Sequence, residues 1–174
     1  MSGGIAAYKA CGLVSEAIKQ GFTVRVVMSA HATRFIGQAT FEGLTGQAVM
    51  TDTFHGEDGM AHIDWPKWAD VVCVAPATAN LLGKLACGLA DDALSTVLMA
   101  VRRGTPIVLA PAMNTEMWFH PVVQRNLGWL RQMPRYRIVE PVDKRLACGD
   151  LGVGGLAEAA DILEAVVAAC GESG

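Results

Sequence analysis

Two short runs of consecutive apolar residues constrain the fold of this chain more than any other feature. Residues 71–75 (VVCVA) and 107–110 (IVLA) are apolar at successive positions rather than alternate ones, which predicts strands buried on both faces. Each run ends in a proline, which cannot donate a hydrogen bond in a sheet. Helical patterns follow at residues 78–88 and 115–132. This alternation predicts a parallel sheet that is covered by helices on both faces.

The rest of the chain continues the alternation. We expect further helices at residues 5–20, 30–36, 39–46, 92–103 and 156–170, further strands at 23–28, 48–51 and 136–139, and loops at 52–60 and 141–155. No linker, repeat or low-complexity segment interrupts this pattern. The predicted fold class is therefore α/β: a doubly wound parallel sheet in a Rossmann-like (flavodoxin-like) three-layer single domain over residues 1–174.

The start of the chain does not fit this pattern completely. Ser2, Gly3 and Gly4 form a small-residue turn that leads into a helix, and such a turn normally follows a strand, which is missing from this chain. A central parallel strand that was lost would leave backbone groups unpaired in the core, so we expect roughly ten further residues upstream. A fold that begins without its first strand is the alternative.

The composition indicates which kinds of molecule this chain binds. Charged residues make up 18% of the chain and the net charge is −3, so nothing indicates a nucleic-acid footprint or a basic membrane-binding helix. An apolar fraction of 52% and a mean hydropathy of +0.32 favour a homo-oligomer that binds a small molecule. Five cysteines without C-x-x-C spacing, no long apolar run and no signal peptide predict a soluble, cytoplasmic protein.

Polar residues follow both of the predicted central strands. Thr78 and Asn80 come after the first strand, and Asn114 comes after the second. Ligands of open α/β sheets bind beyond the carboxyl ends of the strands, so these side chains are candidate ligand contacts, as are Met113 and Met117. The alternative is that they form ordinary strand-to-helix turns in which the methionines pack into the core. The Ser-Gly-Gly turn could hold a phosphate with its free N–H groups.

His62 and Cys148 are the two candidates for acid–base chemistry. His62 ends a predicted loop and could act near neutral pH, although it precedes a strand and would need loop folding or a neighbouring subunit to reach the site. A capping or surface histidine is the alternative. Cys148 lies in a glycine-rich loop where an accessible thiol could deliver a proton. The sequence has neither metal-ligand spacing nor a G-x-S-x-G elbow, and its glycine pattern favours a single-phosphate cofactor over a dinucleotide.

Five motifs taken together resemble those of the homo-oligomeric flavin-containing cysteine decarboxylases, and the match runs nearly end to end. They are SGGIAAYK at residues 2–9, His62 ahead of Ile63 and Asp64, PATAN at 76–80, PAMNTEMW at 111–118, and ACGD at 147–150. Within that family they are most similar to members that act in coenzyme A biosynthesis. The resemblance implies FMN as cofactor and conversion of 4'-phospho-N-pantothenoyl-L-cysteine to 4'-phosphopantetheine and CO2.

The resemblance also implies a mechanism and a role for each residue. Oxidation of the substrate's CH2–SH group to a thioaldehyde supplies an electron sink, CO2 leaves to give an enethiol, and the enethiol is reduced again. His62 would assist the oxidation, Asn114 would hold the substrate's carboxylate and amide, and Cys148 would donate the final proton. The implied flavin contacts are Ser2, Gly3, Gly4, Ser29, Thr78, Ala79, Asn80 and Met113. The implied substrate contacts are Asn114, Ala112, Met113, Met117 and Cys148.

One departure and several alternatives accompany the resemblance. Gly155 stands where the clamp loop of the family usually carries an arginine, which affects clamp closure or one substrate contact. The family implies a trimer or a dodecamer and a phosphopantothenate–cysteine ligase that is fused or separate. The alternative functions are oxidative decarboxylation of a peptide's C-terminal cysteine, a regulatory protein that binds flavin without catalysis, and, with less support, flavin prenyl transfer.

Overall fold

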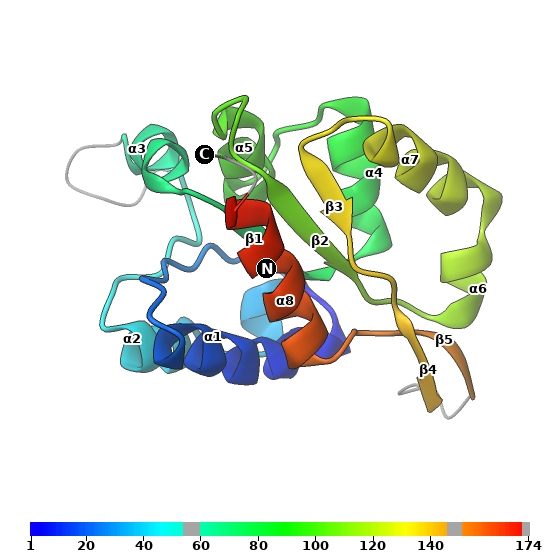
Figure 1. Cartoon of the computed structure of the whole chain (residues 1–174), viewed down its shortest axis with the longest axis horizontal. Coiled ribbons are helices and arrows are strands. Elements are labelled where there is room, and N and C mark those ends of the chain that lie inside the picture. The colour runs from blue at the N-terminus through cyan, green and yellow to red at the C-terminus, as the bar shows by residue number, and fades with distance from the viewer. Residues whose placement is uncertain (54–59, 146–150, 172–174) are drawn as a thin grey trace.

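Three parallel strands form the sheet at the centre of the molecule (Figure 1). The computed structural model describes residues 1–53, 60–145 and 151–171. In order across the sheet, the strands are β1 (Val72–Ala77), β2 (Ile107–Pro111) and β3 (Tyr136–Ile138). All of β2 is buried, as consecutive apolar residues require. The two central strands and the third strand of the prediction are confirmed, although each central strand extends through its proline.

Helices cover both faces of this sheet, which confirms the doubly wound α/β class (Figure 1). One face packs against α4 (Ala79–Cys87), α5 (Ala93–Ala100), α6 (Thr115–Phe119) and α7 (Pro121–Arg131). The other face packs against α1 (Lys9–Lys19) and α8 (Ala159–Gly171). Ile107 and Leu109 point into the first layer, and Val108 and Ala110 point into the second. Side chains of β2 therefore alternate between the two faces of the sheet, which lies as the middle layer between two layers of helices.

The N-terminal region contains less regular structure than the sequence predicts. A 3-10 turn, η1 (Ile5–Tyr8), leads into α1, and α2 (Gln38–Thr45) agrees with the prediction. The predicted helix at residues 30–36 is only the 3-10 turn η2 (Ala32–Arg34). The predicted strands at 23–28 and 48–51 were wrong as regular elements, because only one parallel bridge, Val27 with Met50, joins them. Residues 22–27 line an apolar cavity of about 210 Å³ on the side of β1.

Two helices differ from the prediction for local reasons. The predicted helix at residues 115–132 is divided into α6 and α7, because Pro121 has no N–H group and takes the first position of α7. Nδ1 of His120 accepts a hydrogen bond from the N–H of Val122 at 3.3 Å and caps the second helix. The prediction that His62 ends a loop was wrong, since it lies in the first turn of α3 (Ala61–Trp68).

Part of the predicted loop at residues 141–155 is an antiparallel hairpin of β4 (Val142–Arg145) and β5 (Leu151–Gly155). The N–H of Met113 donates to the carbonyl of Gly154 at 2.9 Å, so β5 is held against the chain that follows β2. The final helix, α8, begins at Ala159 rather than at residue 156. None of the described helices is long and apolar enough to cross a membrane.

Candidate active site

The N-terminal turn is attached to the carboxyl end of β1 through Ser2. The Ser2 hydroxyl donates to the carbonyl of Pro76 at 2.8 Å and accepts from the N–H of Thr78 at 2.9 Å. The backbone N–H of Ser2 donates to the same carbonyl at 3.2 Å. Ser29 lies beside this turn, because its N–H donates to the carbonyl of Met1 at 3.1 Å. The structure therefore brings together Ser2, Ser29 and Thr78, which are far apart in the sequence.

Gly3 allows the N-terminal turn to lie close to residues 29–31. A Cβ atom at Gly3 would lie 2.5 Å from the backbone carbon of His31, so only glycine fits this position. At Gly4 a Cβ atom would meet the Thr78 side chain at 3.5 Å, which is ordinary contact. The turn thus brings its backbone close to residues 29–31 and leaves a hollow beside them.

Gly3→Ala is expected to weaken the site. The added methyl group would push the turn away from His31, at a cost of about 1–3 kcal/mol in unfolding free energy and at least about tenfold in affinity for FMN. Thermal unfolding and a fluorescence titration with FMN measure the two effects. Gly12→Ala is the matched control, because no atom lies within 4 Å of a Cβ atom there. Unchanged stability and FMN affinity in the Gly3→Ala variant would show that the close approach has no role.

A cavity of about 470 Å³ opens beside this turn. Its walls come from the turn, from residues 29–31, from the first turns of α4 and from the chain that leads into α5; they include Ser2, Gly3, Ser29, His31, Thr78, Asn80, Lys84, Asp91 and Asp92. Thr78 is the N-cap residue of α4, so free N–H groups at that helix start lie at the edge of the cavity. Free N–H groups, hydroxyl groups and glycine backbone at one sheet edge can hold a phosphate.

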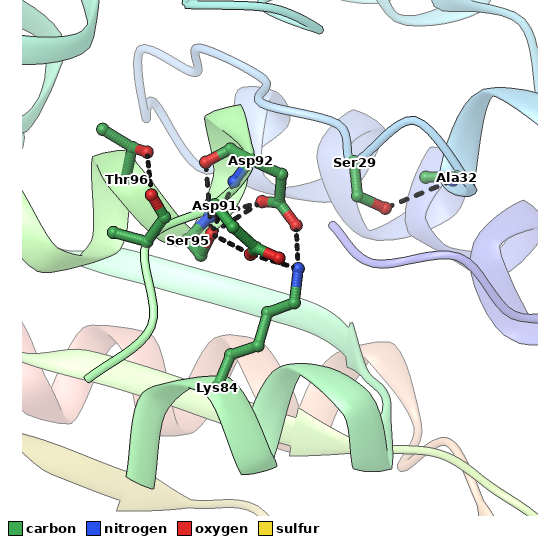
Figure 2. A network of polar contacts seen from close by, with 8 residues as sticks. Ser29, Ala32, Lys84, Asp91, Asp92, Ser95 and Thr96 are labelled. Atoms are coloured by element: carbon green, nitrogen blue, oxygen red, sulfur yellow. Dashed lines mark hydrogen bonds and ion pairs between the residues drawn. The ribbon is translucent and has the colours of Figure 1, made fainter. Parts of the chain in front are cut away.

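An ionic cluster that the sequence analysis missed forms one wall of this cavity. Figure 2 shows Lys84 extending from α4 toward Asp91 and Asp92, with its Nζ atom 2.5 Å and 2.6 Å from their carboxylate oxygens. Only 14% of the Lys84 side chain is exposed. Hydrogen bonds to Asp91 and Asp92 raise the pKa of Lys84, which keeps the lysine charged. The cluster fixes the segment between α4 and α5 over the hollow.

Asp92 also caps α5 in a reciprocal arrangement with Ser95. The Ser95 N–H donates to Oδ1 of Asp92 at 2.8 Å, and the Asp92 N–H donates to the Ser95 hydroxyl at 3.1 Å. Burial alone would raise the pKa of Asp92, but hydrogen bonds from Lys84 and Ser95 outweigh it and lower the pKa. Asp92 directly before an apolar helical run is an N-cap signal that the sequence contains.

Replacing Asp92 should make the chain less sensitive to acid. Because its folded pKa is lowered, Asp92 stabilises the fold above its unfolded pKa of about 4, and this contribution is lost as the pH falls through the folded value. We expect Asp92→Ala to cost about 1–2 kcal/mol near neutral pH, with a smaller deficit in strong acid. Urea unfolding over a pH series measures both. Asp92→Asn, which keeps a capping oxygen, should lose less; equal losses from both variants at every pH would refute this assignment.

Asn114 lies at the carboxyl end of β2 and is the N-cap residue of α6. Its side-chain oxygen accepts from the Glu116 N–H at 2.8 Å. The hairpin packs against this end of the strand, because a Cβ atom at Gly154 would lie 2.2 Å from the Met113 carbonyl oxygen and one at Gly152 would lie 2.7 Å from the Thr115 hydroxyl oxygen. The base of the predicted clamp therefore lies against Asn114 and its neighbours.

The other predicted contacts near Asn114 differ in burial. Ala112 is buried, Met113 is partly buried against the main core, and Met117 is 48% exposed on α6. Gly155, where the family usually has arginine, lies against Lys144: a Cβ atom there would be 2.5 Å from the Lys144 Cε atom. A larger side chain at this position would have to displace Lys144 from its ion pair with Glu158 at 2.9 Å.

His62 does not lie among the described residues that line this cavity. His62 is on α3, which packs against α5 before the amino end of β1, whereas Asn114 follows the carboxyl end of β2 (Figure 1). The His62 Nδ1 atom is buried without a hydrogen-bond partner among the described residues. Cys148 lies outside the described residues. The structure thus brings the turn, Thr78 and Asn80 into one cavity, but it does not join His62 to them within one chain.

Comparison with known proteins defines the class to which this fold and cavity belong. The model of the Flavoprotein family matches residues 1–171, and the chain belongs to that family. It is 46% identical over 166 residues to the coenzyme A biosynthesis bifunctional protein CoaBC of Bacillus subtilis (strain 168). That alignment covers 94% of this chain but 40% of the relative, so the chain spans less than half the length of the curated relative it matches.

Two solved structures have similar folds over nearly their whole length. A mutant PPC decarboxylase complexed with pantothenoylaminoethenethiol superposes with a TM-score of 0.82 at 32% sequence identity, covering 96% of this chain and 93% of the other. The FMN-dependent cysteine decarboxylase SpaF superposes with a TM-score of 0.81 at 36% identity, covering 99% and 93% of the two chains. The family resemblance inferred from the five motifs is confirmed.

Proposed function

We propose that residues 1–174 form one FMN-binding domain that converts 4'-phospho-N-pantothenoyl-L-cysteine to 4'-phosphopantetheine and CO2, a step of coenzyme A biosynthesis. The observation that carries this proposal is the polar cavity that Ser2, Gly3 and Thr78 form at the carboxyl end of β1. Membership of the Flavoprotein family and the similarity to a PPC decarboxylase support it. The similarity to CoaBC supports the place in coenzyme A biosynthesis.

The residues around the cavity fit a flavin mononucleotide. Ser29 would donate its hydroxyl, and Gly3 and Gly4 their backbone N–H groups, to its phosphate, whereas Ser2, whose hydroxyl and N–H already donate to the Pro76 carbonyl, would hold the turn in place. The remaining proposed flavin contacts are Thr78, Ala79 and Asn80, which follow β1, and Met113, which precedes Asn114. When bound, FMN would take a hydride from the substrate's CH2–SH group and later return it.

The substrate would bind at the carboxyl end of β2. We assign its contacts to Ala112, Met113, Asn114, Met117 and Cys148. The Asn114 amide can donate to the departing carboxylate and accept from the substrate amide, which holds the C–COO⁻ bond in one orientation. Cys148 would protonate the enethiol carbon in the last step, because a thiol gives up a proton near neutral pH more easily than a hydroxyl group does.

His62 requires a second subunit in this scheme. Its position on α3, which packs against α5, favours a homo-oligomer in which α3 of one subunit faces the site of another. The family resemblance implies a trimer or a dodecamer. In such an assembly, the His62 imidazole would assist the oxidation of the substrate. A cytoplasmic location, and a ligase that is fused to this domain or separate from it, stay predictions.

An absorbance spectrum and a CO2 assay test the proposal together. The chain saturated with FMN should show a bound-flavin spectrum and release CO2 from phosphopantothenoylcysteine. Bound flavin without CO2 release would favour the regulatory binding protein instead. CO2 release from a peptide with a C-terminal cysteine, but not from phosphopantothenoylcysteine, would favour the peptidyl decarboxylase.

A further inference from the structure

Arg25 lies against two tryptophan rings of α3. Its guanidinium carbon is 4.6 Å from the centroid of the Trp68 ring and 5.3 Å from that of the Trp65 ring. A guanidinium group within about 6 Å of an indole ring is attracted to the face of that ring, and tryptophan is the strongest aromatic partner. Because Trp65 and Trp68 are three residues apart, this one arginine contacts two neighbouring positions along α3.

The backbone that carries Arg25 is anchored in the core. The Met50 N–H donates to the Val26 carbonyl at 3.0 Å, and the Met50 carbonyl accepts from the Met28 N–H at 2.8 Å. Val26 and Met28 are buried in a cluster to which α1 and α2 also contribute side chains. Arg25 therefore reaches α3 from a segment that is itself held in place.

His62 is the next residue along the same side of α3. Helical residues three positions apart are neighbours, so His62 adjoins Trp65, and Trp65 adjoins Trp68. Trp65 also packs against a core cluster that contains Met50 and residues of α5. A contact that fixes the two tryptophan rings thus also fixes the side of the helix from which the imidazole projects.

The first turn of α3, which contains His62, has weak local anchoring among the described residues. Its N-cap residue, Met60, forms no side-chain cap hydrogen bond. The His62 Nδ1 atom is buried and has no hydrogen-bond partner in the part of the chain that the structure describes. The last turn is held separately, because the Arg102 guanidinium donates to the Lys67 carbonyl. The position of the imidazole therefore depends on how α3 as a whole is placed.

We propose that Arg25 is a positioning residue for His62, which it places through the two tryptophan rings of α3. This inference rests on the proposed function, in which His62 assists the oxidation of the substrate. Misplacement of a reacting group by about 1 Å can lower a rate by about a hundredfold, so the anchoring of the helix matters for the reaction. The planar guanidinium of arginine stacks on indole rings, whereas the ammonium of lysine is a compact charge, so lysine should replace Arg25 only in part.

The first part of the test asks whether Arg25 holds α3, and it uses the chain without cofactor. Arg25→Gln removes the charge, so we expect amide hydrogen exchange in residues 61–68 to become at least about fivefold faster. Arg25→Lys should show a smaller increase. Arg125→Gln is the matched control, because the Arg125 guanidinium lies 4.8 Å from the Trp129 ring on α7, and it should leave exchange in residues 61–68 unchanged. Unchanged exchange in the Arg25→Gln variant would overturn the proposal.

The second part measures the rate at which phosphopantothenoylcysteine reduces the flavin of the FMN-saturated chain. Arg25→Gln should slow this step at least about fivefold with the affinity for FMN unchanged, and Arg25→Lys should keep part of the rate. In a chain that carries His62→Asn, Arg25→Gln should slow the residual rate no further, because the two residues act through one path. The same fold loss in both backgrounds would overturn the positioning role.

The two parts separate this inference from the proposed function. If the substrate failed to reduce the flavin of the unchanged chain, the proposed function would be wrong, and the role of Arg25 in the reaction would be wrong with it. The exchange measurement would still decide whether Arg25 holds α3. If the unchanged chain and the Arg25→Gln variant were reduced at the same rate, only the role of Arg25 would be wrong.

Discussion

Cys148→Ser should stop the reaction before its last step. The variant is expected to bind FMN and release CO2, but to accumulate an enethiol product that has two hydrogen atoms fewer than phosphopantetheine, with the flavin left reduced. A serine hydroxyl is a much weaker acid than a thiol, so loss of the proton donor should slow phosphopantetheine formation by about 10²–10⁴-fold. Mass spectrometry of the product and the flavin absorbance measure both effects.

Cys87→Ser is the control for this experiment, because Cys87 is exposed at the end of α4 and lies outside the cavity lining. Its product and rate should match those of the unchanged chain. Complete turnover to phosphopantetheine by Cys148→Ser would remove Cys148 from the mechanism.

Asn114→Asp is the second change with a large expected effect. Asp caps a helix as well as Asn does, so α6 and the fold should keep their stability. The new carboxylate would face the substrate's carboxylate, and two like charges at about 4 Å repel by about 4 kcal/mol at an effective dielectric constant of about 20. We therefore expect kcat/KM to fall by at least about a hundredfold while the melting temperature stays unchanged.

Asn114→Ser separates this charge effect from the loss of the amide. Serine also caps the helix, so its smaller loss of kcat/KM would report the missing amide contacts alone. If Asn114→Asp bound and decarboxylated the substrate normally, Asn114 would be only the capping residue of α6.

The sequence was sufficient for the parts of the fold in which local pattern and burial agree. Residues 71–75 and 107–110 form central strands because consecutive apolar side chains need cover on both faces. Thr78, Asn80 and Asn114 follow these strands, and Thr78 and Asn80 line the cavity at the carboxyl end of β1. The hydrogen bond between Ser2 and Thr78 was not predicted, because no periodicity joins residues so far apart; the resemblance implied only that both contact the flavin.

The predictions of secondary structure and of side-chain pairing were wrong or incomplete where tertiary contacts, rather than the local sequence pattern, determine the structure. Residues 23–28 have the composition of a strand, but on one side they line the apolar cavity beside β1, and Val27 alone forms a bridge, with Met50. The hairpin of β4 and β5 depends on contacts of Gly152 and Gly154 with the chain after β2, which the glycine content alone does not show. Lys84 pairs with Asp91 and Asp92 across the turn between two helices, and neither charge pattern nor helix spacing predicts that approach.

Mass spectrometry of the product that the FMN-loaded chain makes from phosphopantothenoylcysteine tests the central claim most directly. A product that has lost CO2 and nothing else, formed over many turnovers without an added reductant, is the predicted result. A product that has also lost two hydrogen atoms would contradict the re-reduction step and point to an oxidative decarboxylase. Unchanged substrate, in the presence of bound FMN, would contradict decarboxylation altogether.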